Sequence, residues 1–407
     1  MKIGFVTAPD TVQNRIASIH SFHEAQALQA AGNELVFLRP AAGRVSPDLY
    51  LRRLTSRIFL GKKLLPDREP AVLGGYARQL AALLEETPVD VIFSHGSLPV
   101  SLLGGQTPIV FWSDATFAGM IDFYPGFTRL DRRSVQFGNA MEQAALDHAA
   151  LVLYSSDWAR QTCLENYRVD PQKVKVIPFG PNLHAEPSSE RVREAVRARG
   201  RKVCQLVFSG VEWERKGGDL AIGLAAELNR RGQPTELTVI GCQPAASSGL
   251  PAFVRPVGYL DLSKPEGEQR YIDLLAGAHF LVLPTRADCS PRVLMEANAF
   301  GLPCLTTAVG GIPSIVQPGI NGALFSGGDD FIPQAAAFVE HALGGMAVYR
   351  KLALQSLEYH RAHHTWELSA HQIGLLLEGL LERDDKTPVP CGTGARFQVG
   401  SVPSARK

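Results

Sequence analysis

Short apolar runs that alternate with longer helical patterns are the feature that most constrains the fold of this chain. Each run is apolar along most of its length and does not alternate with polar residues, as is typical of strands buried on both faces of a sheet. This order predicts parallel sheets with helices on both sides. The runs lie at 3–6, 34–38, 90–94, 108–112, 151–154, 174–179, 204–210, 236–241, 280–284 and 303–307. The helical patterns lie at 15–31, 70–86, 129–149, 216–231 and 330–344.

A break in this pattern divides the chain. Residues 181–200 begin with proline, asparagine and serine, become charged, and contain no apolar run. We therefore expect two α/β domains joined by a linker, with a ligand site at the carboxyl ends of the strands, in the cleft between them. The expected divisions are a first domain at 1–182, a linker at 183–200, a second domain at 201–365, a C-terminal helix at 366–383 that could pack back on the first domain, and a disordered tail at 384–407.

Composition excludes several other classes of protein. The net charge of +1 gives no global basic field, so a nucleic-acid partner is not expected. The six cysteines are scattered without a CxxC pair, which disfavours a cysteine-built zinc site and favours a reducing compartment. The beginning of the sequence has no signal-peptide pattern. The uncharged stretch at 297–328 holds three prolines and seven glycines, so it is not one membrane helix. We expect a cytoplasmic protein.

The strongest motif is PTRADCSPRVLMEANAFGLPCLTTAVGG, which follows a predicted strand. Asp288 and Glu296 flank a predicted helix start, with Ser290 as its N-cap and Pro291 in the first turn. Backbone amides at such a start favour an anion, here at 290–293. Amides for a diphosphate and carboxylates for sugar hydroxyls together suit a sugar nucleotide. The alternative is a helix whose N-terminal acids only favour its dipole.

A second motif, VFSGVEWERKGG, follows the first predicted strand of the second domain. Arg215 and Lys216 stand in the loop after this strand, ahead of Gly217 and Gly218, where Lys216 is expected to open a helix. Two cations there would neutralise a diphosphate leaving group. The alternative is a solvated basic pair before a helix.

Taken in order, these motifs resemble the retaining glycosyltransferases of family four, which have the GT-B fold. The resemblance rests on FSG…RKGG, on Asp288 and Glu296 followed by AxAxGLP, and on TxxGGIP. The stretches PIVFWSDATF and LYSSDWARQTCLENYRVDPQKVKVIPFGPN in the first domain are also similar to that family. The resemblance covers residues 1 to about 380 and implies two Rossmann-like domains, each with a doubly wound parallel sheet, facing a central cleft.

The resemblance also implies roles for individual residues. Glu296 would hold the nucleotide ribose, Asp288 would contact the donor sugar, and Lys216 would bind phosphate, with Arg215 beside it. Asp114 lies in the first-domain loop where the family often has a histidine near the transferred sugar. The donor-binding set implied is Gly210, Ser290, Pro291, Arg292, Val293, Glu296, Gly310 and Gly311.

Three departures from the family pattern affect these roles. Asp288 stands where the family usually has a glutamate, so its contact with the sugar could differ. Val211 stands where many members have arginine, so Arg215 would have to substitute. The loop TAPDTVQNRIASIH lacks the usual double glycine. No DxD occurs in the chain, which disfavours metal-dependent sugar-nucleotide binding, and neither a P-loop nor a GxGxxG after a strand is present. We expect no metal and no cofactor apart from the donor substrate.

The resulting hypothesis is a retaining, metal-independent glycosyltransferase that moves a sugar from a nucleoside-diphosphate sugar to an acceptor hydroxyl in glycan, polysaccharide or glycoconjugate biosynthesis. The acceptor could be a carbohydrate, a lipid-linked glycan or a small molecule. Two alternatives stay open. One is a GT-B nucleotide-sugar epimerase, which would recruit Asp114 or His95 as an acid or base, and the other is a non-catalytic sugar-nucleotide or glycan binder.

Residues 44–68 form a separate basic and apolar stretch. They carry seven cations against Asp48 and Asp67, a net charge of +5, with leucine, isoleucine and phenylalanine at roughly helical spacing. Such a segment could lie on the anionic inner face of a membrane and reach a lipid-linked acceptor. The alternative is an amphipathic helix packed on the first domain.

Overall fold

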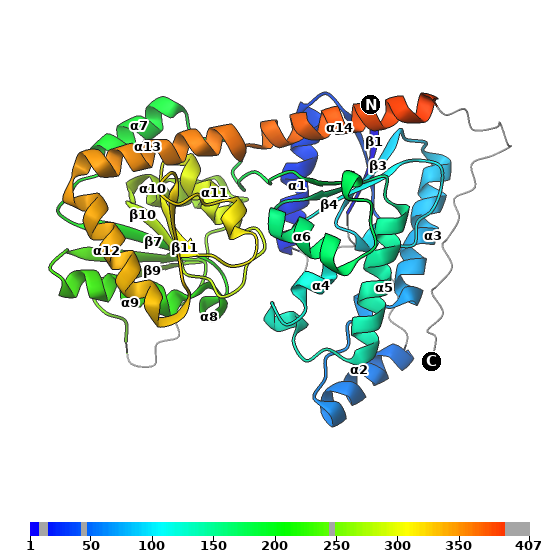
Figure 1. Cartoon of the computed structure of the whole chain (residues 1–407), viewed down its shortest axis with the longest axis horizontal. Helices are drawn as coiled ribbons and strands as arrows, with labels where there is room; N and C mark the ends of the chain where they lie inside the picture. The colour runs from blue at the N-terminus through cyan, green and yellow to red at the C-terminus, as the bar shows by residue number, and fades with distance from the viewer. Residues whose placement is uncertain (8–14, 42–46, 244–248, 387–407) are drawn as a thin grey trace. The chain divides into compact units, whose positions relative to one another are not determined.

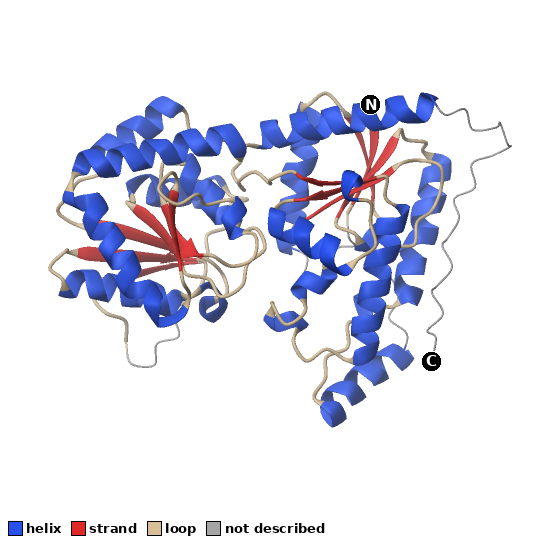
Figure 2. Ribbon diagram, in the orientation of Figure 1, coloured by secondary structure: helices blue, strands red, loops and turns tan. Residues whose placement is uncertain are grey.

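The computed structural model describes residues 1–7, 15–41, 47–243 and 249–386. The chain forms two compact units, one of Met1–Pro178 with Trp366–Lys407 and one of Phe179–Thr365. Each unit contains one six-stranded parallel sheet covered by helices on both faces (Figures 1 and 2). The predicted class, two doubly wound α/β domains, is confirmed.

The sheet of the first unit has the strand order β2-β1-β3-β4-β5-β6. Its central strands are buried except for a terminal residue in β1, β3 and β4, because helices cover both faces. Phe5 pairs with Phe37 on one side and with Phe93 on the other, and the Phe5 and Phe93 rings stack 6.0 Å apart. The strands are β1 (Lys2–Val6), β2 (Glu34–Leu38), β3 (Val91–His95), β4 (Ile109–Ser113), β5 (Leu151–Tyr154) and β6 (Val174–Val176).

Helices of the first unit begin where the sequence offers caps. Asp131 accepts a hydrogen bond from the Arg133 amide at the start of α5, and Ser156 caps α6 in the same way. The helices are α1 (Arg15–Ala30), α2 (Pro47–Leu60), α3 (Pro70–Glu86), α4 (Phe117–Met120), α5 (Arg132–His148), α6 (Asp157–Asn166) and α14 (Trp366–Lys386).

The C-terminal helix α14 belongs to the first unit although it follows the second in sequence. It packs on α1, and Trp366 stands edge-on to Trp112 of β4 with ring centroids 6.0 Å apart. The Ser369 hydroxyl donates to the carbonyl of Pro178 at 2.7 Å. The chain therefore returns to the unit in which it begins.

The sheet of the second unit has the order β12-β11-β10-β7-β8-β9. Two of its strands, β9 and β12, were not predicted; the first contains a proline and an arginine, and the second is short and begins with glycine. The strands are β7 (Cys204–Ser209), β8 (Thr235–Ile240), β9 (Val254–Gly258), β10 (Phe280–Leu283), β11 (Cys304–Thr307) and β12 (Gly322–Phe325). The helices are α7 (Ser189–Ala198), α8 (Trp213–Lys216), α9 (Gly218–Arg230), α10 (Pro265–Gly277), α11 (Arg292–Ala299), α12 (Phe331–Gly344) and α13 (Met346–His363).

The segment expected to be a linker, 183–200, lies within the second unit and contains α7. Val192 and Val196, one turn apart, are the buried residues of this helix. Arg199, just after the helix, is buried and donates to the carbonyls of Phe300 and Gly301. The segment is thus a packed part of the second unit, and the boundary between the units falls at Pro178 and Phe179.

Candidate functional site

Two loops meet at the carboxyl ends of β7 and β10 in the second unit. These strands are neighbours, but β8 lies on one side of β7 and β10 on the other, so the pair marks the point where the strand order reverses. Open parallel sheets bind ligands at this point. The loops are joined by main-chain contacts, in which the Arg286 amide and the Thr285 hydroxyl both donate to the Arg215 carbonyl, at 2.8 and 3.1 Å.

Lys216 and Asp288 form the central ion pair of this site. The lysine Nζ lies 2.5 Å from Asp288 Oδ2, and both side chains are almost fully buried. The predicted phosphate-binding cation and the predicted sugar-contacting carboxylate are therefore brought together across 72 residues of sequence. Because water is largely excluded here, each charge compensates the other. The pairing lowers the desolvation cost of burying a cation where an anionic ligand could bind.

Arg215 contacts the same carboxylate less closely. Its Nη1 donates to the Ala287 carbonyl at 2.7 Å and lies 3.5 Å from Asp288 Oδ2. Its Nε and Nη2 donate to the two oxygens of Glu212, and these bonds lower the pKa of the Glu212 carboxyl. The guanidinium thus holds the two loops together, and it would have to exchange Glu212 for a phosphate to reach the ligand directly.

Glycines allow the loop after β7 to come this close. The sequence predicted that Lys216 opens a helix, but Lys216 is the last residue of the short helix α8. Gly217 follows it with φ +77°. A Cβ on Gly217 would lie 2.1 Å from the Pro284 carbonyl oxygen, and one on Gly210 would lie 3.0 Å from Lys216 Cγ. The close approach of the two loops therefore requires glycine at 217.

Glu296 lies on α11 with its carboxylate buried in a polar pocket. Tyr271 of α10 donates its hydroxyl to Oε2 at 2.5 Å, and the Asn182 amide donates to Oε1 at 3.2 Å. Burial raises the pKa of the Glu296 carboxyl above its ordinary value, although these hydrogen bonds and the charges of Arg292 and Lys216 act in the opposite direction. A carboxylate held by two donors and two nearby cations is a well-oriented acceptor for hydroxyl groups.

The start of α11 differs in detail from the prediction. The helix begins at Arg292 and its N-cap is Pro291, with no side-chain cap, so Ser290 is not the N-cap. Pro291 has no N–H, so only Ser290, Arg292 and Val293 of the predicted amide set can donate. The Arg292 side chain is buried, with its guanidinium 4.3 Å from the ring centroid of Phe179 and 3.4 Å from Asn182 Oδ1.

A third loop follows β11, the strand beside β10. Gly310 has φ +53°, and Gly311 precedes a short 3-10 helix at Ile312–Ser314. The Thr307 hydroxyl donates to the Thr285 carbonyl and fixes the end of β11 against the loop of Asp288. The predicted glycine pair therefore lies at the same end of the sheet as Lys216.

Asp114 lies in the first unit, exposed, in the loop between β4 and α4. Lys216, Asp288 and Glu296 lie in the second unit. One strand away from Asp114, His95 ends β3 with its Nδ1 2.8 Å from the fully buried carboxylate of Glu24 on α1. This pair stands where the strand order of the first sheet reverses, between β1 and β3.

Sequence reasoning missed three residues that shape the site: Tyr271, Asn182 and Glu212. Tyr271 looks like an ordinary core aromatic in an amphipathic helix, and Asn182 acts through its main-chain amide as well as its side chain. Neither contact leaves a local signal in the sequence. Among the residues the structure describes, no group of three or more histidine, cysteine or acidic side chains is placed to hold a metal ion.

Comparison with known proteins bears on both units. Two protein-family models match the chain: "Glycosyltransferase Family 4" over residues 17–184 and "Glycosyl transferases group 1" over residues 204–343. Together these matches span well over half of the sequence and include Glu296, Lys216 and Asp288.

Individual proteins match this chain at low sequence identity. The chain is 26% identical over 266 residues to a D-inositol 3-phosphate glycosyltransferase of Corynebacterium jeikeium, a match that covers 61% of this chain and 62% of that protein. The structure is similar to sucrose-phosphate synthase from Thermosynechococcus elongatus, with TM-score 0.67, 18% identity and coverage of 94% and 100%. It is also similar to Anabaena Alr3699/HepE in complex with UDP, with TM-score 0.63, 14% identity and coverage of 93% and 100%. These structural neighbours share the GT-B fold.

Proposed function

This chain belongs to the family-four glycosyltransferases, and we propose that it transfers a sugar from a nucleoside-diphosphate sugar to an acceptor hydroxyl with retention of anomeric configuration. The observation that carries the proposal is the pairing of Lys216 with Asp288 across the loops after β7 and β10. This pair stands at the point of the sheet where doubly wound folds bind nucleotides. The curated relative is matched over less than two thirds of its length, so its own activity and acceptor are not carried over.

The chemistry needs positive charge where the diphosphate leaves. As the bond from the anomeric carbon to the phosphate oxygen breaks, negative charge grows on that oxygen, and Lys216 with the amides of Ser290, Arg292 and Val293 would stabilise it. The acceptor hydroxyl then bonds to the anomeric carbon on the same face, and its proton passes to the departing phosphate oxygen. In this proposal no protein base takes part, and Lys216 supplies positive charge without a bound metal.

Glu296 would orient the nucleotide. Its carboxylate is already fixed by Tyr271 and Asn182 and could accept hydrogen bonds from the two ribose hydroxyls. Arg215 would act mainly as a positioning residue, because its bonds to Glu212 and Ala287 hold the loop that carries Asp288. The UDP bound in the similar Anabaena protein makes a uridine nucleotide the first donor to test.

The acceptor side belongs to the first unit in this proposal. Asp114 would lie near the transferred sugar, and a carbohydrate, lipid-linked glycan or small molecule would supply the hydroxyl. We place the reaction in the cytoplasm, where nucleotide sugars are the activated donors. None of the helices described combines the length and the apolar character that crossing a bilayer requires.

A thermal-shift screen with UDP, GDP, ADP and their common sugar conjugates tests the donor site. A ligand at about 100 times its dissociation constant stabilises the folded state by roughly 2.7 kcal/mol. We expect a shift with one base, and a smaller shift in Glu296→Ala than in Glu340→Ala, a matched change on α12 of the same unit.

The next step separates transfer from its alternatives. With the responding donor, mass spectrometry should show a new glycoside only when an acceptor is present. An isomerised donor without acceptor would indicate an epimerase, and a thermal shift with no turnover for any acceptor class would indicate a binding protein. Absence of a shift with every nucleotide would contradict the proposal.

A further inference from the structure

Helix α2 (Pro47–Leu60) presents apolar side chains to solvent. Only Leu49 and Ser56 of this helix are buried. Leu51, Leu54 and Ile58 follow the spacing i, i+3, i+7, and each lies about 200° around the helix from a buried position. Their exposed fractions are 59%, 45% and 64%, and Phe59 reaches 80%. Figure 1 shows α2 at the periphery of the first unit, next to α5.

Unpaired cations lie on one side of this apolar stripe. The side chains of Arg53, Arg57 and Lys62 are exposed and form no hydrogen bond or ion pair with the residues the structure describes, although the Lys62 main chain bonds with Ser56. Other cations of the basic segment are engaged elsewhere, because Arg68 is buried under the Phe117 ring and Lys63 donates to the Pro125 carbonyl. Arg44 lies outside the described residues. Three side-chain cations near the stripe are therefore free to contact an anionic surface, fewer than the seven cations in the sequence of this segment.

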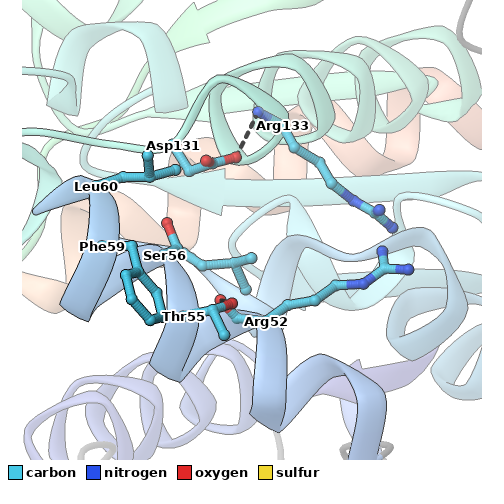
Figure 3. Close-up of a pocket in the computed structure, with 8 residues that line it drawn as sticks. Arg52, Thr55, Ser56, Phe59, Leu60, Asp131 and Arg133 are labelled. Atoms are coloured by element: carbon cyan, nitrogen blue, oxygen red, sulfur yellow. Dashed lines mark hydrogen bonds between the residues drawn. The ribbon is translucent and has the colours of Figure 1, made fainter.

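A cavity of about 380 Å³ lies on the other flank of α2, towards the start of α5 (Figure 3). Its apolar lining comes from Phe59, Leu60 and Leu64. Arg52 and Arg133 extend their guanidinium groups towards one end of it, and both are held by acids, Arg52 by Asp48 at 3.1 Å and Arg133 by Glu69 at 2.9 Å. Asp131 also lines the cavity, so the cavity adds apolar surface beside α2 and no unpaired positive charge.

From these observations we propose that α2 docks the protein on an anionic lipid bilayer. Leu51, Leu54 and Ile58 would enter the boundary between headgroups and acyl chains, and Arg53, Arg57 and Lys62 would contact the anionic headgroups. A second copy of the chain fits the surface poorly, because a two-fold contact through α2 would gather the same unpaired cations from both copies at one interface. The surface lies within the first unit and does not depend on the proposed transfer reaction.

Vesicle co-sedimentation of the full chain, with no sugar nucleotide present, tests the proposal. The two probes are vesicles of phosphatidylcholine alone and vesicles that also contain about 30% phosphatidylglycerol. The anionic lipid gives the second kind a negative surface potential. We expect the protein to bind only the anionic vesicles. Binding should weaken as the salt concentration rises to about 1 M, where the screening length falls to about 3 Å.

Two pairs of variants locate the contact. Arg53→Gln with Arg57→Gln should weaken vesicle binding about 30-fold, since each basic side chain near an anionic surface contributes about fivefold. Leu54→Ser with Ile58→Ser should weaken it about tenfold or more. The matched controls are Arg197→Gln with Lys351→Gln and Val348→Ser with Leu375→Ser, exposed positions on other helices. Because all these side chains are exposed, the variants should fold normally, which the unfolding midpoint checks.

Three outcomes would overturn the proposal. The protein could fail to bind anionic vesicles, the controls could lose binding as much as the α2 variants, or the chain could dimerise in a way that Leu54→Ser with Ile58→Ser abolishes while vesicles have no effect. Nucleotide binding, measured in the same samples by thermal shift, keeps this result separate from the proposed transfer. A protein that binds UDP but not vesicles would retain the catalytic proposal and lose the docking proposal.

Discussion

The two sheets differ in the side chains they place where the strand order reverses. In the second unit, between β7 and β10, a lysine faces an aspartate at 2.5 Å. In the first unit, between β1 and β3, a histidine faces a glutamate at 2.8 Å. A lysine ammonium group only donates hydrogen bonds, whereas an imidazole can donate or accept them. Under the proposed function, the lysine end would bind the donor diphosphate and the histidine end would face a neutral hydroxyl group.

The largest expected effect comes from removing the cation of the second unit. Lys216→Ala should reduce turnover of the nucleotide sugar about 100-fold or more, because the charge that develops on the leaving phosphate loses its partner. Steady-state kinetics with the donor identified by thermal shift would measure this loss. Asp288 would also lose its counter-charge, so the unfolding midpoint must be measured alongside.

His95→Gln is the matched change at the other sheet end, and Lys351→Ala is the control for a lysine outside the site. We expect both variants to bind the nucleotide as the unmodified protein does. If His95→Gln weakened nucleotide binding as much as Lys216→Ala, the result would contradict the assignment of nucleotide binding to the Lys216 end alone. Normal turnover by Lys216→Ala would remove the phosphate role assigned to this residue.

A glycine in each unit tests how tightly its loops are built. Gly217 and Gly96 both have positive φ, +77° and +84°, but a Cβ on Gly217 would collide with the Pro284 carbonyl, whereas none of the neighbours of Gly96 lies within 4 Å of such a Cβ. Gly96→Ala should cost about 1–2 kcal/mol of unfolding free energy through backbone strain alone. Gly217→Ala should cost more and should also weaken nucleotide binding. Equal costs in denaturant titrations would show that the two loops can be displaced equally easily.

Much of the fold could be predicted from the sequence, because strands buried on both faces leave continuous apolar runs. Every predicted run overlaps one strand, the first β1 at Lys2–Val6 and the last β11 at Cys304–Thr307. The pattern failed where the sequence is locally ambiguous. In α7 two buried valines are outnumbered by charged residues, and β9 carries Arg255 and Pro256 on its exposed part.

The candidate site was predicted only as far as its loop residues. Cations and acids directly after apolar runs mark the ends of parallel strands, so Lys216 and Asp288 could be expected near one another. Tyr271 and Asn182 could not, because they reach Glu296 from 25 and 114 residues away and carry no motif of their own. The N-cap at Ser290 was wrong by one residue, a shift that local capping preferences do not resolve.

Two buried glutamates give the next comparison. Glu296 in the second unit lies at the proposed ribose site, and Glu142 on α5 of the first unit accepts from the Ser97 hydroxyl at 2.7 Å. Glu296→Gln should weaken nucleotide binding about tenfold, the effect of losing charge-assisted bonds of about 1.5 kcal/mol to the ribose. Glu142→Gln should leave the affinity unchanged. Isothermal titration of both variants would measure this, and equal losses would place the effect in general stability.

The smallest effect expected is on the pH dependence of stability. Burial raises the pKa of both Glu296 and Glu142 above the ordinary value of 4.5. The unfolded chain then releases these protons first, so the stability from each protonated carboxyl is complete below pH 4.5 and declines as the pH rises through the raised pKa. The decline is at most about 1.4 kcal/mol per pH unit for each group. Denaturant titrations from pH 4.5 to 7.5 should show a shallower slope in each glutamine variant. In Glu142→Gln, saturating nucleotide should flatten the remaining slope, because hydrogen bonds from the ribose to Glu296 would favour its ionised form. In Glu296→Gln, nucleotide should leave the slope unaltered.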